Sequence, residues 1–116
     1  MKVLALIYGD ESAWESLSDE DRQGVYARYR AFGEQADGKV ANGAEIAPTS
    51  AATTVRVRDG ETQVTDGPAV ELDEPLGGFY LLEVGSLDEA AEVAAHIPGA
   101  ASGAVELRAA SEEEAP

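Results

Sequence analysis

Two side chains are the first candidates for acid and base chemistry, the carboxylate of Asp66 and the imidazole of His96. An unperturbed imidazole titrates near neutral pH, and a carboxylate in a cleft can take up or release a proton. His96 is the single histidine, and it precedes Ile97-Pro98-Gly99, which is typical of the end of a helix. At that position the ring would interact with the last carbonyl groups and the helix dipole, and we favour this structural interpretation.

Asp66 begins the run Asp66-Gly67-Pro68. Asp can start a turn through its own side chain, Gly permits unusual φ angles and Pro fixes the exit, so a shaped loop accounts for all three residues. In the alternative, functional interpretation Asp66 lies in a cleft as a general base or as a hydrogen-bond acceptor for a ligand. Tyr8 and Tyr80 are expected to line the same cleft, because their hydroxyl groups need polar partners when the rings are buried.

The carboxylates of Glu71, Asp73 and Glu74 could act with Asp66 as an acid and base set or bind Mg²⁺. Their spacing does not match an EF-hand loop, and no histidine supplements them, so we interpret them as solvated side chains of an acidic chain. Gly77-Gly78 is not followed by the helix of a phosphate-binding loop and instead predicts a bulge or a close backbone contact. We therefore expect no metal and no other cofactor, and find no convincing catalytic set.

Composition limits the partners of the chain. Its 116 residues correspond to one domain, and 44% apolar residues predict a packed core. Asp and Glu number 23 against 8 Lys and Arg, and the net charge of -15 disfavours nucleic acids and anionic membranes as partners. The absence of cysteine excludes disulfides and thiolate chemistry. No signal peptide or membrane-spanning segment is recognisable, so we expect a cytoplasmic protein.

Hydropathy patterns predict the strands that must position these side chains. Apolar runs at Lys2–Tyr8 and Gly78–Val84 are typical of strands buried on both faces. A β-hairpin is predicted from residues 53–58 and 61–65, because they flank Asp59-Gly60, a pair that type I′ turns favour. Further strands are expected at residues 44–47, after an Asn42-Gly43 turn, and at residues 103–109.

Two helices are predicted, each after a serine that can cap its first turn. They span residues 19–37 after Ser18 and residues 87–96 after Ser86, and a short helical turn is expected within residues 11–17. The order is then strand, helix, strand, hairpin, strand, helix, strand. This order predicts an α+β fold with a ferredoxin-like βαββαβ core and an extra β-hairpin. Residues 1–110 form the expected domain, and the acidic residues 111–116 are predicted to be disordered.

Two helices can cover only one face of the predicted sheet. The strands at Lys2–Tyr8 and Gly78–Val84 are nevertheless apolar on both faces, so the second face needs a cover that one chain does not contain. We expect this cover to be the sheet of a second copy. The sequence therefore predicts a homodimer in which two sheets pack face to face.

Four segments together resemble the YCII-related family, specifically its DGPF-type branch. They are MKVLALIYGDESAW, TTVRVRDGETQVTDGP, LGGFYLLEVGSLDEA, and AAHIPGA with GAVELR, which follow one another between Met1 and Ala109. The resemblance implies a ferredoxin-like fold that forms a dimeric α+β barrel. It also implies a regulatory or stress-linked setting, because genes of this branch often lie beside those of extracytoplasmic-function sigma factors.

The chain departs from the family at two positions that bear on activity. The aromatic residue that usually follows the DGP run is Ala69 here, and the His and Asp proposed as a catalytic pair in another branch have no counterpart near the first helix. We therefore expect a homodimeric binding or regulatory module with a small-molecule or protein partner. The alternative is an enzyme that uses Asp66 with His96 or a tyrosine on a small substrate. A common polar pocket for Asp66 and His96 would favour the enzyme.

Overall fold

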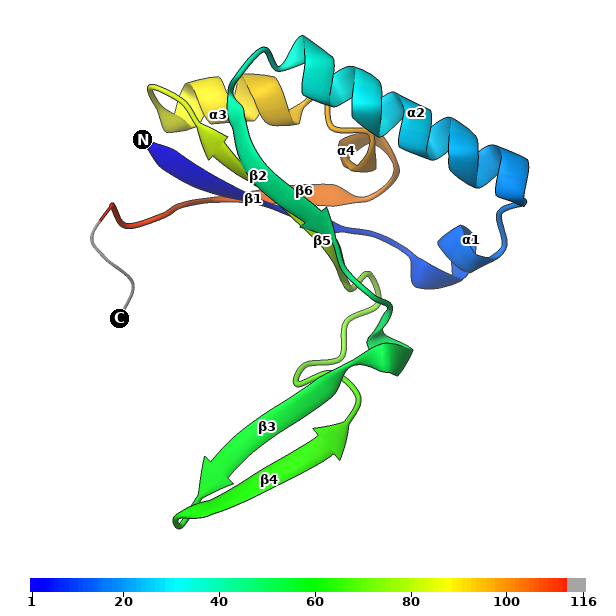
Figure 1. The fold of residues 1–116 in the computed structure, drawn as a ribbon, viewed down its shortest axis with the longest axis vertical. Coiled ribbons are helices and arrows are strands. Elements are labelled where there is room, and N and C mark those ends of the chain that lie inside the picture. The colour runs from blue at the N-terminus through cyan, green and yellow to red at the C-terminus, as the bar shows by residue number, and fades with distance from the viewer. Residues whose placement is uncertain (113–116) are drawn as a thin grey trace.

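The computed structural model describes residues 1–112, which form an α+β fold with the predicted order of strands and helices (Figure 1). In chain order its elements are β1 (Lys2–Tyr8), α1 (Glu11–Glu15), α2 (Asp19–Gln35), β2 (Val40–Glu45), the 3₁₀ helix η1 (Thr49–Ala51), β3 (Thr53–Arg58), β4 (Glu61–Asp66), β5 (Leu76–Glu83), α3 (Leu87–Ala94), α4 (Gly99–Ser102) and β6 (Ala104–Ala109). Disorder is predicted for residues 111–116, and residues 113–116 of this segment lie outside the described residues.

Four strands form one antiparallel sheet in the order β2-β5-β1-β6. This is the strand order of a ferredoxin-like core, in which the first strand and the strand before the last helix are central. α2, α3 and α4 lie on one side of the sheet (Figure 1). In the order of strands given above, β1 and β5 are the inner strands, as the apolar sequence of both predicts.

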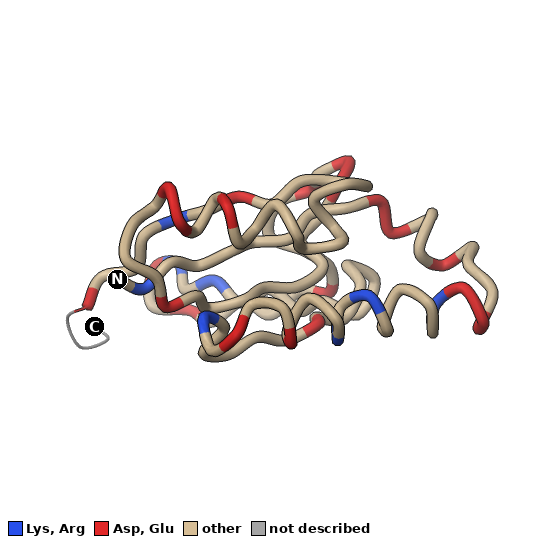
Figure 2. The backbone as a smooth tube through the Cα atoms, turned by 90° about the horizontal axis from the view of Figure 1, so that it is seen from above, with Lys and Arg blue, Asp and Glu red and all other residues tan. Residues whose placement is uncertain are grey.

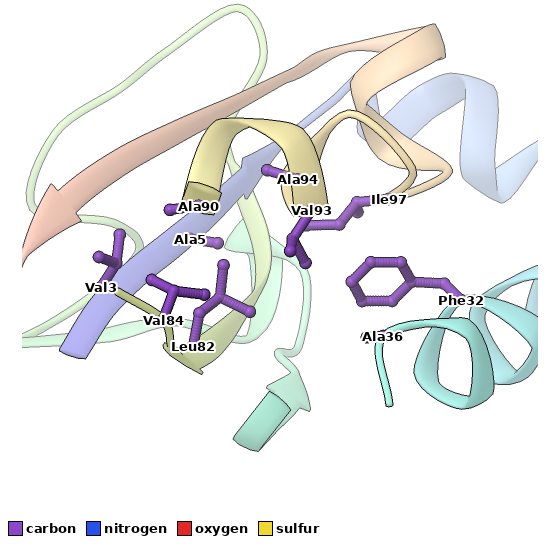
Figure 3. Packing of buried hydrophobic residues seen from close by; sticks show 10 residues of the cluster. All are labelled: Val3, Ala5, Phe32, Ala36, Leu82, Val84, Ala90, Val93, Ala94 and Ile97. Atoms are coloured by element: carbon purple, nitrogen blue, oxygen red, sulfur yellow. The ribbon is translucent and has the colours of Figure 1, made fainter. Parts of the chain in front are cut away.

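The hydrophobic core lies between the sheet and its helices (Figure 3). Val3 and Ala5 of β1 and Leu82 of β5 are completely buried, and Phe32 of α2 and Ile97 after α3 pack against them. Every second residue of β1 thus points toward the helices, as strand geometry requires. The residues between them must point to the other face.

Residues 53–66, here called the hairpin arm, form a separate two-stranded sheet of β3 and β4. Asp59 and Gly60 connect the two strands with φ angles of 52° and 77°, so the predicted type of turn, which needs positive φ at both positions, is confirmed. The arm extends away from the sheet on the side opposite the helices (Figure 1).

The predicted strand at residues 44–47 was placed too late in the chain. β2 runs from Val40 to Glu45, and Asn42-Gly43 lies inside it instead of forming a turn. The pairing of β2 with β5 is irregular between Val40 and Asn42, where Ala41 is the extra residue, whereas Asn42 and Gly43 pair with Leu81 and Tyr80. A Cβ atom on Gly43 would lie 2.6 Å from the ring of Tyr80, so glycine is required there by packing.

The predicted helix caps are confirmed, and both helices end slightly earlier than predicted. The hydroxyl group of Ser18 accepts a hydrogen bond from the amide of Asp21, and that of Ser86 accepts one from the amide of Glu89, over 3.1 Å in each case. Glu89 reaches back to the amide of Gly85, one residue before the position that a capping box usually serves. The sequence did not predict α4, a single turn between α3 and β6.

No helix among residues 1–112 is both long enough and apolar enough to cross a bilayer.

Candidate functional site

The face of the sheet away from the helices, here called the open face, has an apolar centre. Leu4 and Leu6 of β1 alternate with the buried Val3 and Ala5, so their side chains point to this face. Their cross-strand partners on β5 are Leu81 and Phe79, respectively. All four side chains of this centre are only half-buried, because no element of the described chain covers them. Apolar side chains on a sheet face that has no covering layer are suited to contact with a partner.

Charged residues of both signs surround this centre. Lys2 of β1 pairs with Glu83 of β5 at one end, and on β6 Arg108 and Glu106 stand opposite Leu4 and Leu6. The guanidinium of Arg108 donates a hydrogen bond to the carboxylate of Glu106, which raises the pKa of Arg108. A surface that carries an apolar centre and both charges at its edge can be complementary to itself under a twofold rotation.

The loop after β4 has the shape that turn chemistry predicts. Gly67 adopts a φ of 105°, which favours glycine, and its amide donates to the carbonyl of Ala52 over 2.8 Å. Its own carbonyl accepts a hydrogen bond of 2.7 Å from the hydroxyl of Thr54. The side chain of Asp66 is exposed, and Pro68 is half-buried. Asp66-Gly67-Pro68 therefore connects the hairpin arm to the chain that returns to β5.

His96 follows the end of α3, as its sequence context predicts. Its amide donates to the carbonyl of Val93 over 3.1 Å, and its side chain is exposed. It borders a shallow cavity of about 210 Å³ on the helix side, whose other lining residues are Phe32, Gln35, Ala36, Lys39, Glu92 and Val93. Asp66 does not line this cavity, since it lies on the hairpin arm on the opposite side of the sheet. The structure does not bring the two candidates together in one chain.

Tyr8 and Tyr80 point to opposite faces of the sheet. Tyr8 continues the alternation of Leu4 and Leu6 and faces the open side. The ring of Tyr80 packs in the core, with its centroid 5.2 Å from that of Phe32 and 6.5 Å from that of Tyr29. Burial raises the pKa of the hydroxyl groups of Tyr29 and Tyr80. Of the two tyrosines, Tyr8 alone is placed to meet a molecule bound at the open face.

The acidic residues give no cation site in the part of the chain that the structure describes. Glu71, Asp73 and Glu74 are exposed in the loop before β5, and no group of three acidic or histidine side chains within residues 1–112 is arranged to hold a metal ion. Asp and Glu are instead spread along helices, strands and loops (Figure 2). Gly77 is the extra residue at an irregularity in the pairing of β1 with β5, which confirms the bulge predicted at Gly77-Gly78.

A group of polar and aromatic contacts ties α1 to its neighbours, and sequence patterns did not predict it. The carboxylate of Glu11 accepts hydrogen bonds from the amide and the hydroxyl of Thr49, over 2.7 and 2.6 Å. The guanidinium of Arg22 lies 5.7 Å from the ring of Trp14 and donates to its carbonyl group. Glu11 and Thr49 lie 38 positions apart and Arg22 and Trp14 lie 8 positions apart, so neither contact follows from the periodicity of one helix or strand.

Tyr26 joins α2 to β2 in the same region. Its hydroxyl group donates to the carboxylate of Glu45 over 3.2 Å, and its ring meets that of Trp14 edge to face, with centroids 5.4 Å apart. The pKa of Tyr26 is raised by desolvation and by the nearby carboxylate of Glu45. α1, α2 and β2 are thus joined at the end of the sheet from which the hairpin arm departs (Figure 1).

Comparisons with known proteins agree with this architecture. The chain is 39% identical over 117 residues to the uncharacterized protein R00369 of Rhizobium meliloti (strain 1021), an alignment that covers 93% of this chain and 90% of that protein. Its fold is similar to that of 5-chloro-2-hydroxyhydroquinone dehydrochlorinase (TftG) from Burkholderia phenoliruptrix AC1100, solved in complex with 2,5-dihydroxybenzoquinone. That similarity has a TM-score of 0.56 and 16% sequence identity, and it covers 97% of this chain and 96% of the other.

At 16% identity the similarity concerns the fold alone. The model of the YCII-related domain matches residues 1–113, nearly the whole chain. This protein belongs to the family of YCII-related domains.

Proposed function

We propose that the protein is a homodimeric binding module, in which two copies pack with the open faces of their sheets together. The observation that carries the proposal is the apolar centre of Leu4, Leu6, Phe79 and Leu81, which is only half-buried. Burying a fully exposed Leu or Phe side chain contributes about 1.5–3 kcal/mol. These four side chains are already half-buried, so a second copy that covers them gains a part of this free energy from each. The ring of Tyr8 lies on the same face and supplies a polar hydroxyl group beside this centre.

The interior of such a dimer is the ligand site that we propose. Two facing sheets enclose a space lined by leucines, Phe79 and Tyr8, which suits a small apolar or aromatic molecule with one or two polar groups. The regulatory role expected from the family resemblance fits a module whose assembly responds to such a ligand. A link to extracytoplasmic-function sigma factor signalling is part of this proposal.

The alternative is an enzyme that uses acid and base chemistry near Asp66. Asp66 is exposed, and His96 borders a cavity on the other side of the sheet, so these two groups do not support it within one chain. The fold is shared with a dehydrochlorinase solved in complex with 2,5-dihydroxybenzoquinone. That compound is therefore a suitable first test ligand, and titration calorimetry and an assay of its turnover would separate binding from catalysis.

The dimer is tested by the mass in solution, measured by light scattering at micromolar concentration. We expect twice the chain mass of 12.1 kDa for the wild-type protein. Leu6→Lys places a charge on the open face of each copy and should weaken association by at least about 100-fold, because two charges would be desolvated in one interface.

The matched control for this variant is Leu87→Lys. Leu87 is 48% exposed at the start of α3, on the helix side of the sheet, so its replacement should leave the dimer intact. Circular dichroism should give the same spectrum for both variants. A wild-type protein with the mass of one chain would refute the proposal.

A further inference from the structure

The hairpin arm has one apolar face. Val55 and Val57 on β3 and Val64 on β4 share this face, because Val55 pairs with Val64 and Val57 pairs with Thr62. The three valines are 61%, 58% and 63% exposed, respectively. They are among the most exposed large apolar side chains of the described residues, and we call them the valine face.

The opposite face of the arm is polar, and the returning chain partly covers it. Thr54 donates from its hydroxyl to the carbonyl of Gly67 over 2.7 Å, and Arg56 donates to the carbonyl of Ala69 over 3.4 Å. The chain thus protects the polar face and leaves the valine face uncovered. This is the reverse of what a solvent-exposed hairpin requires, because polar side chains need no cover and valines do.

The position of the arm indicates what covers the valine face. The arm extends from the sheet on the side of the open face (Figure 1), so a body that packs on the open face lies next to the arm. A two-stranded hairpin by itself is marginally stable in water, and packing against another layer is the usual source of its stability. The open face and the arm therefore border the same space.

The dimensions of the chain agree with a missing partner. Its accessible surface is 7989 Å², whereas a compact monomer of this mass exposes about 6000 Å². Its radius of gyration is 16.0 Å, compared with about 13 Å for a compact domain of this length. Each chain thus exposes about 2000 Å² more than a compact monomer would, or about 4000 Å² for two chains. This area falls in the size range of obligate dimer interfaces.

We propose that the valine face packs on the body of a second copy, with the two arms exchanged reciprocally around the dimer. This inference rests on the homodimer proposed above and adds a second contact surface to it. Under twofold symmetry each arm packs against the other chain, so Val55, Val57 and Val64 of both arms are buried in one dimer. The arm then fixes how the two open faces are oriented relative to each other.

The absence of cysteine allows a direct test, because one introduced cysteine is the only thiol in the chain. Thr62→Cys places the thiol on the valine face, and Gln63→Cys places it on the polar face one residue away. Both residues are exposed in the single chain, so they form a matched pair. The rate of reaction with a thiol reagent is measured for each at a protein concentration at which the wild-type protein has the mass of a dimer.

The proposal expects Thr62→Cys to react at least about 10-fold more slowly than Gln63→Cys, because the dimer buries the valine face. When each is combined with Leu6→Lys, which dissociates the dimer, the rate of Thr62→Cys should rise by at least about 10-fold, while that of Gln63→Cys should stay nearly unchanged. Equal rates in the intact dimer would overturn the exchange of arms while leaving the packing of the sheets in place.

Two further outcomes would also refute the inference. Slow reaction of Thr62→Cys that persists in the Leu6→Lys background would mean that the valine face is covered within one chain. A wild-type protein with the mass of one chain would overturn both the dimer and the exchange of arms, and the valine face would then be a surface for a different protein.

Discussion

Both carboxylate oxygens of Glu11 accept a hydrogen bond from Thr49, one from its amide over 2.7 Å and one from its hydroxyl over 2.6 Å. Glu11 is the first residue of α1, and Thr49 is the first residue of η1, which directly precedes the hairpin arm. This contact therefore joins the start of the arm to the helical layer. It spans 38 positions of the sequence, and both partners are partly buried.

Glu11→Ala should lower the free energy of unfolding by about 2 kcal/mol, because a hydrogen bond to a charged group contributes about 1.5–3 kcal/mol. The melting temperature should fall by about 5–10 °C, as measured by circular dichroism. Glu15→Ala is the control, since Glu15 lies at the other end of α1 and its side chain is exposed. Helix propensity cannot cause such a loss, because Ala is a better helix former than Glu. A loss of the same size in both variants would therefore contradict the importance of the contact with Thr49.

Stability should decrease at alkaline pH because burial raises the pKa of Tyr29 and Tyr80 in the folded chain. A tyrosine with a raised pKa binds its proton more tightly when folded, so its contribution is complete below about pH 10 and is lost as the pH rises through the folded value. Urea unfolding at about pH 8 and about pH 11 would measure the loss. Tyr80→Phe should reduce this pH dependence, and an unchanged loss would exclude Tyr80 as its source.

Two glycines should respond to alanine in opposite directions. A Cβ atom on Gly103 would lie 2.1 Å from the carbonyl oxygen of Tyr8, so Gly103→Ala should lower the free energy of unfolding by about 3 kcal/mol. Gly33 lies inside α2, and a Cβ atom added there would have nothing within 4 Å. Gly33→Ala should therefore raise the free energy of unfolding by about 1 kcal/mol through helix propensity. Chemical denaturation measures both. Two changes of the same sign would contradict this packing.

The proposed dimer should become tighter as salt is added. Each chain carries a net charge of -15, so two copies repel one another, and salt screens this repulsion. Sedimentation equilibrium should give a lower dissociation constant at about 300 mM NaCl than at about 10 mM, where the screening length is about 30 Å. Leu6→Lys should remain monomeric at both concentrations. A dissociation constant that increases with salt would indicate that ion pairs, and not apolar contacts, dominate the interface.

The sequence alone was sufficient for the elements that depend on neighbouring residues. Ser18 and Ser86 cap the two long helices because a serine hydroxyl can reach an amide three residues away. Asp59-Gly60 forms the predicted hairpin turn because both residues can adopt positive φ. The unbroken apolar runs of β1 and β5 likewise predicted the inner strands and a sheet face that one chain leaves uncovered. Each of these signals lies within a few residues of the element that it specifies.

The two faces of the hairpin arm also have a local signal in the sequence. In TTVRVR the valines alternate with arginines, which already assigns one face of the hairpin arm as apolar and the other as polar. Only the fold could reveal that Gly67 and Ala69 return over the polar face, which leaves Val55, Val57 and Val64 exposed.

Contacts between distant residues were decided by tertiary structure alone. Asn42-Gly43 reads as a turn, but packing of Gly43 against the ring of Tyr80 keeps it inside β2. Asp66 is the last residue of β4 in the hairpin arm, and His96 follows α3 in the helical layer. The arm and α3 lie on opposite sides of the sheet (Figure 1), so the two residues are kept apart. Local residue types fix turns, caps and periodicity, whereas the direction in which each element leaves the sheet depends on the packing of the whole chain.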